Sequence, residues 1–228
     1  LGVACACGTV GIIVGTATLT GLGLRIASAI VAIAGGMLLP SLLLTMVACI
    51  LLGAGLPTTA NFIVTSTMCA PALFKLNVPP MAAYMFVLYF GIAADLSPPV
   101  ALAAYAGAGI AGDDPMKTGA TAVKLALAGF LVPYIYVYNP MLVLVGFVPH
   151  KFALALVTAI LGVFLLGMSS IGFYKAKLAF WQRILAFIGA LGLLIPGIQT
   201  DVLGLVILGS MHFLQVQKVR KLQEPSHS

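Results

Sequence analysis

The fold of this chain is decided by the stretch Gly53-Ala54-Gly55-Leu56-Pro57-Thr58-Thr59-Ala60-Asn61, which interrupts a run from Ile26 to Phe74 that contains no Asp, Glu, Lys or Arg. Glycine and proline break the helical hydrogen-bond ladder, and the freed backbone groups then need partners where no water is available. A broken segment at membrane depth persists only where protein buries it or where it lines a cavity. The hydroxyl and amide side chains beside the break therefore indicate a site for a small polar ligand.

The composition identifies a membrane protein. Of the 228 residues, 62% are hydrophobic and only 7% are charged, whereas about a quarter of the residues in a soluble domain are charged. Apolar runs of about twenty residues, the length of a transmembrane helix, recur along the chain. The sequence predicts an all-α, polytopic membrane protein, and its basic residues cluster at span ends rather than in a nucleic-acid-binding surface.

The start of the chain and its cysteines complete this picture. The sequence begins at Leu1 with apolar residues, without a charged region or a cleavage site, so we expect the C-terminal portion of a longer chain rather than a signal peptide. The four cysteines all lie in apolar spans, and we expect buried free thiols that pack as small hydrophobic groups.

Residues 38–74 are predicted to form a re-entrant helical hairpin with its tip near Pro57. The first arm, from Met37 to Leu52, would be about 24 Å long at 1.5 Å per residue, and the second would run from Ala60 to Leu73. Each arm is short for a membrane core of about 30 Å. The alternative is one full span with a kink.

A second break, Asp95-Leu96-Ser97-Pro98-Pro99, interrupts the apolar segment 81–112, which we predict to be a broken helix. The two prolines have no amide hydrogen for the carbonyls of the preceding turn. An ionisable group within an apolar span, here Asp95, indicates a functional site. The alternative is that Asp95 caps the half-helix beginning near Val100 or faces water.

Oxygen atoms at the two breaks favour a small hard cation such as Na⁺. The half-helix N-termini near Ala60 and Val100 favour an anionic ligand. In the alternative interpretation, the same side chains only satisfy the broken backbone. We predict as ion- or substrate-binding residues Gly55, Pro57, Thr58, Thr59, Asn61, Asp95, Ser97, Pro98 and Pro99, and as candidate Na⁺ ligands Thr58, Thr59 and Ser97 with nearby backbone carbonyls.

The other spans follow from the apolar runs. Residues 1–36 are expected to form a helix from Leu1 to about Gly15 and another from about Leu24 to Ala34, as one bent span or as a span and an interfacial helix. A span is expected at 116–138, and three more at Phe152–Tyr174, Arg183–Ile198 and Val202–Val216. Basic residues follow the first and the last of these three, so both clusters should lie on one, cytoplasmic side. The hairpin at 38–74 then opens from the external face.

Enzymes are disfavoured by the absence of catalytic motifs. The sequence has no phosphate loop, zinc signature or dinucleotide fingerprint. Asp95 and Asp201 lack the Gly-x-Gly-Asp context of an intramembrane aspartyl pair. We therefore expect no enzymatic activity and no cofactor.

An ordered series of motifs resembles the large membrane subunit of tripartite ATP-independent periplasmic (TRAP) transporters, and most closely the fused permeases of the TAXI branch. The motifs are Gly55-Leu56-Pro57-Thr58-Thr59-Ala60, Ala70-Pro71-Ala72-Leu73, Leu96-Ser97-Pro98-Pro99-Val100-Ala101-Leu102-Ala103-Ala104-Tyr105, Ile110-Ala111-Gly112 and Val137-Tyr138-Asn139-Pro140. The resemblance implies an elevator-type transporter with two inverted repeats. Residues 1–142 would be the second repeat, and 143–228 would be three additional helices with a short basic cytoplasmic tail.

The resemblance also implies a function. It implies Na⁺-driven import of a carboxylate-type solute across the cytoplasmic membrane of a bacterium or archaeon. The implied partners are a periplasmic solute-binding protein, the remainder of the permease (the first repeat and the small-subunit helices) and membrane lipid, without nucleic acid. A hypothesis from another class is a membrane scaffold or assembly subunit that does not transport.

Overall fold

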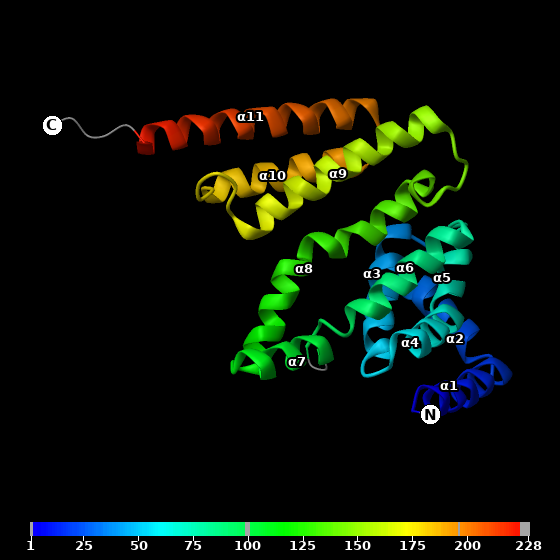
Figure 1. Cartoon of the computed structure of the whole chain (residues 1–228). Coiled ribbons are helices and arrows are strands. Elements are labelled where there is room, and N and C mark those ends of the chain that lie inside the picture. The colour runs from blue at the N-terminus through cyan, green and yellow to red at the C-terminus, as the bar shows by residue number, and fades with distance from the viewer. Residues whose placement is uncertain (1, 99–100, 196, 224–228) are drawn as a thin grey trace. The chain divides into compact units, whose positions relative to one another are not determined.

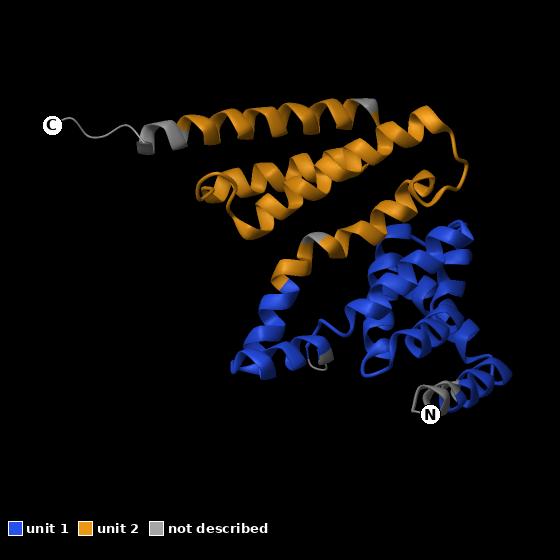
Figure 2. Cartoon of the chain, in the orientation of Figure 1, with its two compact units in different colours: residues 1–123 blue, residues 124–228 orange. Residues whose placement is uncertain are grey.

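The structure is a computed structural model that describes residues 2–98, 101–195 and 197–223. These residues form α-helices and one 3₁₀ turn, and their only β-type pairing is an isolated bridge between Phe173 and Lys177. The predicted all-α fold is therefore confirmed. The chain divides into two compact units, residues 1–123 and 124–228 (Figure 2), which are described separately. The predicted division at residue 142 concerns transporter repeats and stays a prediction.

The first unit is built from short helices (Figure 1). They are α1 (Gly2–Leu19), α2 (Leu22–Ile33), α3 (Leu38–Gly53), α4 (Thr58–Met68), α5 (Ala70–Phe74), α6 (Pro80–Ala93), α7 (Leu102–Ala111) and the beginning of α8 (Pro115–Tyr138). Helices α3 and α4 contact each other, and both contact α6. Helix α3 ends at Gly53 before α4 begins at Thr58, and α6 ends at Ala93 before α7 begins at Leu102, so both predicted breaks are present.

The first helix is longer than predicted. It continues past Gly15 to Leu19, and the Thr16 and Thr18 hydroxyls donate to the carbonyls of Ile12 and Val14, one turn back, both at 2.8 Å. These hydroxyls are therefore satisfied within the helix. The turn falls at Gly21, whose φ of 65° is left-handed.

The second arm of the predicted hairpin differs at both ends. It begins at Thr58 rather than Ala60, and it stops at Met68 before restarting as α5. Pro71 has no amide hydrogen to donate to the Thr67 carbonyl, and α4 ends shortly before it, at Met68. Gly23 of α2 lies against this carbonyl, since a Cβ at Gly23 would be 2.7 Å from the Thr67 oxygen.

Small and polar residues are buried on both arms. Ser41, Thr45, Cys49 and Gly53 follow one another at four-residue spacing on α3, and all are buried. Asn61 and Thr65 are buried on α4. The Thr45 hydroxyl donates to the Ser41 carbonyl at 2.7 Å and the Thr65 hydroxyl to the Asn61 carbonyl at 2.9 Å, so these hydroxyls are satisfied within their own helices. Small side chains let helix backbones approach closely where two helices contact each other, as α3 and α4 do.

The second unit contains longer helices. After the end of α8 come η1 (Pro140–Val143), α9 (Pro149–Ile171), α10 (Phe180–Leu194) and α11 (Ile198–Gln223). The three predicted C-terminal helices are present, and each begins three or four residues earlier than predicted. Leu165, Leu166, Ala186, Ala190 and Met211 lie at their common core. Among the described residues, α8 and α9 are long and apolar enough to cross a membrane, and α10 is a shorter apolar helix.

A cationic side chain and a buried amide pair hold the end of this unit together. Arg183 donates from Nε to the Ser169 carbonyl and from Nη2 to the Ser170 carbonyl, both at 2.8 Å. These carbonyls belong to the last turn of α9, where helix carbonyls lack donors and a positive charge is favourable. Gln182 of α10 and Gln215 of α11 share a buried hydrogen bond of 3.3 Å.

Candidate functional site

The first break is a tight turn between α3 and α4. The Gly53 carbonyl accepts from the Leu56 amide at 3.2 Å. Gly55 follows with φ 79°, a left-handed conformation that favours glycine. Pro57 precedes α4 in an extended conformation, and its carbonyl accepts from the Asn61 amide at 2.9 Å.

The predicted Na⁺ ligands of this break, Thr58 and Thr59, lie in the first turn of α4. Both residues are exposed, and neither hydroxyl has a hydrogen-bond partner in the part of the chain that the structure describes. Most other hydroxyls of the unit instead donate to a carbonyl of their own helix, as Thr67 does to Ile63 at 2.8 Å. The oxygens at the tip are therefore available to a ligand.

The second break begins at the end of α6. Its first turn is held by short-range bonds, with the Asp95 amide donating to the Ile92 carbonyl at 3.1 Å and the Ser97 hydroxyl to the Ala93 carbonyl at 2.9 Å. The Asp95 carbonyl accepts from the Ala103 amide at 3.2 Å, which links the break to the first turn of α7. Ala101 has φ 34°, so the chain turns sharply before α7 begins.

Of the two prolines of this break, the structure describes only Pro98. Pro98 packs toward α8, because a Cβ at Gly119 would lie 3.2 Å from the Pro98 Cγ. This contact gives Pro98 a packing role beside its predicted role in the site. Pro99 lies outside the described residues.

Asn61 joins the two breaks. Its side chain is 1% exposed. Its Nδ2 donates to the Gly53 carbonyl at 3.2 Å and to the Gly91 carbonyl at 2.6 Å. Gly53 is the last residue of α3, and Gly91 lies in the last turn of α6. One buried amide therefore ties the end of the first hairpin arm to the end of the broken helix.

This arrangement requires glycine at both contacts. A Cβ at Gly53 would lie 2.6 Å from Asn61 Nδ2, and a Cβ at Gly91 would lie 2.6 Å from Asn61 Oδ1. Contacts this short do not occur between real Cβ atoms and their neighbours, so any larger residue would displace the amide. Gly91 was not among the predicted site residues. Its only signal in the sequence is a glycine one turn before the break in an otherwise apolar helix.

Two side-chain oxygens at the breaks lack partners. Among the described residues, Asn61 Oδ1 and Asp95 Oδ1 are buried atoms with no hydrogen bond. A buried acceptor without a partner costs free energy, and a functional site or a bound ion is a common explanation. No hydrogen bond links Asp95, Thr58 or Thr59 directly to the opposite break in the described part of the chain, so Asn61 makes the side-chain connection between the breaks.

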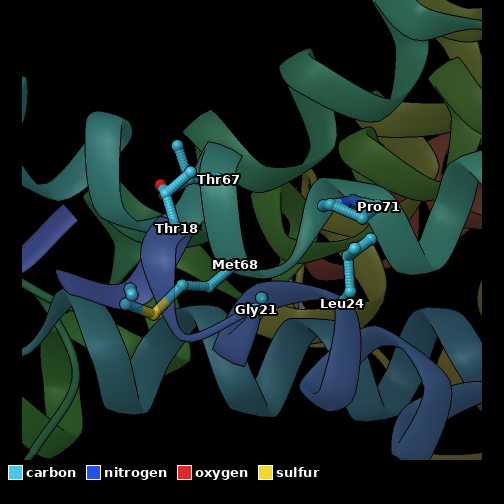
Figure 3. A pocket seen from close by; sticks show the side chains of 8 residues that line it. Thr18, Gly21, Leu24, Thr67, Met68 and Pro71 are labelled. Carbon is cyan, nitrogen blue, oxygen red and sulfur yellow. The ribbon is translucent and has the colours of Figure 1, made fainter. Parts of the chain in front are cut away.

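The unit also contains a cavity of about 140 Å³ away from the breaks. Figure 3 shows residues that line it, which come from α1, α2 and the turn between them (Thr18, Gly21 and Leu24) and from α4 and α5 (Thr67, Met68 and Pro71). None of the predicted site residues lines it. We assign the candidate site to the breaks.

The comparisons with known proteins identify the family of the chain. The sequence model of the family described as "Tripartite ATP-independent periplasmic transporter, DctM component" matches residues 1–151. No curated protein and no solved structure matches the chain. The matched residues include both breaks, Asn61 and all of α1 to α8. The chain therefore belongs to the DctM family, the large membrane component of tripartite ATP-independent periplasmic transporters, which are multi-pass transport proteins and not enzymes.

Proposed function

We propose that this chain is the part of a Na⁺-coupled secondary transporter that holds the ion and solute sites. It imports a carboxylate-type solute delivered by a periplasmic binding protein, across the cytoplasmic membrane of a bacterium or archaeon. The observation that carries this proposal is the buried Asn61, which ties two broken helices together while its own Oδ1 and that of Asp95 lack partners.

The available oxygens fit a Na⁺ ion. Thr58 and Thr59 carry hydroxyls without partners at the tip. The Ser97 hydroxyl uses its hydrogen on the Ala93 carbonyl, and a hydroxyl that donates in this way keeps its oxygen lone pairs for a cation. Hydroxyl and carbonyl oxygens beside unwound helices are the usual ligands of coupling ions in transporters.

The helix ends fit an anionic solute. Helices α4 and α7 both begin at a break, at Thr58 and Leu102. The N-terminus of a helix carries a partial positive charge and unpaired amide hydrogens, which favour a carboxylate. A cation bound between the breaks would add to the positive electrostatic potential at these helix ends. Ion and solute then bind more tightly together than separately, which is the coupling that a symporter needs.

Asn61 links the two breaks physically, which explains how ion binding and solute binding are coupled. Because its Nδ2 holds both Gly53 and Gly91, an ion that orders one break also restrains the other. In this mechanism Na⁺ orders the hairpin tip first, the ordered tip completes the solute site, and both ligands then move with the domain.

Replacing Thr58 and Ser97 with alanine tests the ion site. We expect the Na⁺ concentration for half-maximal uptake to rise about tenfold, as for the loss of roughly 1.4 kcal/mol of ion binding. The measurement is uptake of labelled solute into vesicles that contain the assembled transporter and its binding protein. Ser66→Ala is the control, because its hydroxyl donates to the Ile63 carbonyl at 3.1 Å within α4, away from the tip. Unchanged Na⁺ dependence in the double variant, with lower stability only, would favour the scaffold hypothesis.

A further inference from the structure

The second unit has an open groove between α9 and α11 that the mechanism above does not use. Its volume is about 380 Å³, which is within the range of ligand pockets. Its walls are apolar and include Phe164, Met168, Leu205, Leu208 and Gly209. Gly209 leaves space in the wall, since a Cβ there would meet no atom within 4 Å.

One end of the groove is polar, and contacts with neighbouring residues hold it in place. The Tyr174 hydroxyl and His212 Nδ1, both of which line the groove, share a hydrogen bond of 3.0 Å. The Tyr174 ring packs edge-on against Phe164, with ring centroids 5.8 Å apart. The Ala176 amide donates to Gln215 Oε1 at 3.1 Å, which holds the turn between α9 and α10 against α11. This end is therefore fixed by three separate contacts.

The same end is positively charged. Lys175 lies with its Nζ 6.0 Å from the centre of the Tyr174 ring, and Lys177 is exposed in the same turn. Helix α11 continues beyond His212 through Lys218, Arg220 and Lys221, so the two basic clusters share one end of the unit, as the sequence predicts. In the described part of 124–228, the only acidic residue is Asp201. It lies eleven residues before His212, about 16 Å along the helix.

We propose that this groove binds an anionic phospholipid. One acyl chain lies along the apolar walls, and the phosphate lies at Tyr174, His212 and Lys175. The Lys175 ammonium can donate to it, and so can whichever of the Tyr174 hydroxyl and His212 Nε2 keeps a hydrogen beside their shared bond. Basic pockets between membrane helices on the cytoplasmic side are typical sites for such headgroups. The basic residues place this end of the groove in the cytoplasmic leaflet. A soluble anion would explain the charges but not the apolar walls.

The proposal rests on the membrane location of the family and not on Na⁺ coupling, so the two can fail separately. It explains a feature of α9 to α11, most of which lies beyond the residues matched by the family. A bound lipid would fill the space between these helices.

The test measures which lipid stays bound to the whole chain. The protein is reconstituted in vesicles of equal amounts of dioleoyl phosphatidylglycerol and dioleoyl phosphatidylcholine, extracted in mild detergent, and its retained lipid is quantified by mass spectrometry. We expect phosphatidylglycerol to be enriched about fivefold over phosphatidylcholine, as for one basic residue near a membrane surface. Lys175→Gln combined with Lys177→Gln should remove the enrichment, because these exposed lysines carry the positive charge of the turn at this end of the groove.

A second variant tests the proposal by filling the groove. Gly209→Phe places a ring in the groove and should reduce retained phosphatidylglycerol to the level of phosphatidylcholine. Gly167→Phe on α9 is the matched control, because a Cβ at Gly167 also meets nothing within 4 Å but does not line the groove. Equal retention of both lipids by the unchanged protein, or enrichment that survives Gly209→Phe, would overturn the proposal. So would a change of oligomeric state in Gly209→Phe measured by light scattering, which would assign the groove to a second copy of the chain.

Discussion

Asn61→Asp is expected to abolish solute uptake. The substitution keeps the shape of the side chain but replaces the Nδ2 donor with an oxygen. That oxygen would face the Gly53 and Gly91 carbonyls at the present distances of 3.2 Å and 2.6 Å. Two acceptors at such distances repel each other, and a buried carboxylate without a donor is strongly unfavourable. The two breaks should therefore separate.

Asn61→Ala should have a related but smaller effect. It removes both hydrogen bonds without adding a charge, which costs about 2 kcal/mol for two bonds of ordinary strength. Uptake into vesicles and thermal unfolding in detergent measure the two consequences. Thr65→Val is the control one turn along α4, because this buried hydroxyl bonds only within its own helix. Normal uptake kinetics in Asn61→Asp would show that the tie between the breaks has no part in transport.

Gly91→Ala is expected to destabilise the first unit and to impair uptake. The new Cβ would lie 2.6 Å from Asn61 Oδ1, and the Asn61 amide is held on its other side by its hydrogen bond of 3.2 Å to the Gly53 carbonyl. Overpacking of this kind typically costs about 1–3 kcal/mol. We expect a lower unfolding temperature and a loss of uptake.

Gly107→Ala on α7 is the matched control. A Cβ at Gly107 meets nothing within 4 Å, so the substitution adds the same methyl group without a clash. Replacing glycine with alanine within a helix is otherwise stabilising by about 0.5–1 kcal/mol. Equal effects of Gly91→Ala and Gly107→Ala on unfolding temperature and uptake would contradict the packing around Asn61.

A double-mutant cycle separates the clash from other effects of Gly91→Ala. When Asn61 is already alanine, the space beside Gly91 is open, and the added methyl group should cost much less. Residues in contact typically show coupling energies of about 0.5–3 kcal/mol. Additive effects of the two substitutions on the free energy of unfolding would indicate that Gly91→Ala acts elsewhere.

The positions of the breaks could be predicted from the sequence because they depend on local chemistry. Glycine and proline at 53–57 and proline at 98 disfavour helix through their own backbone chemistry. The helices indeed end at Gly53 and Ala93. Pro71 also follows a helix end, that of α4 at Met68. Pro133, in contrast, lies inside α8, so a proline alone does not decide where a helix ends.

The connection between the breaks could not be predicted in the same way. Asn61 and Gly91 are thirty residues apart, and only the packing of α4 on α6 brings them together. Periodicity shows which face of a helix is buried, but not which partner it meets. The predicted helix end near Gly15 was wrong: α1 continues to Leu19, and the hydroxyls of Thr16 and Thr18 bond within it.

In the second unit, too, the polar residues of the sequence do not reveal which side chains contact each other. The three C-terminal helices follow from apolar runs, but the Gln182–Gln215 and Tyr174–His212 contacts join residues 33 and 38 positions apart. Each of these residues, taken alone in the sequence, resembles a polar group at the end of a span. The groove and its basic end become visible only when the turn between α9 and α10 lies against α11.

The central claim is that the two breaks form one Na⁺-linked site joined through Asn61. Backbone hydrogen exchange of segments 54–59 and 94–97, compared in Na⁺ and in K⁺ at equal ionic strength, tests it most directly. The account predicts that Na⁺ slows exchange in both segments together, over the same range of Na⁺ concentration, and that Asn61→Ala removes this parallel response. Exchange that is identical in Na⁺ and K⁺, or slowed in only one of the two segments, would contradict it.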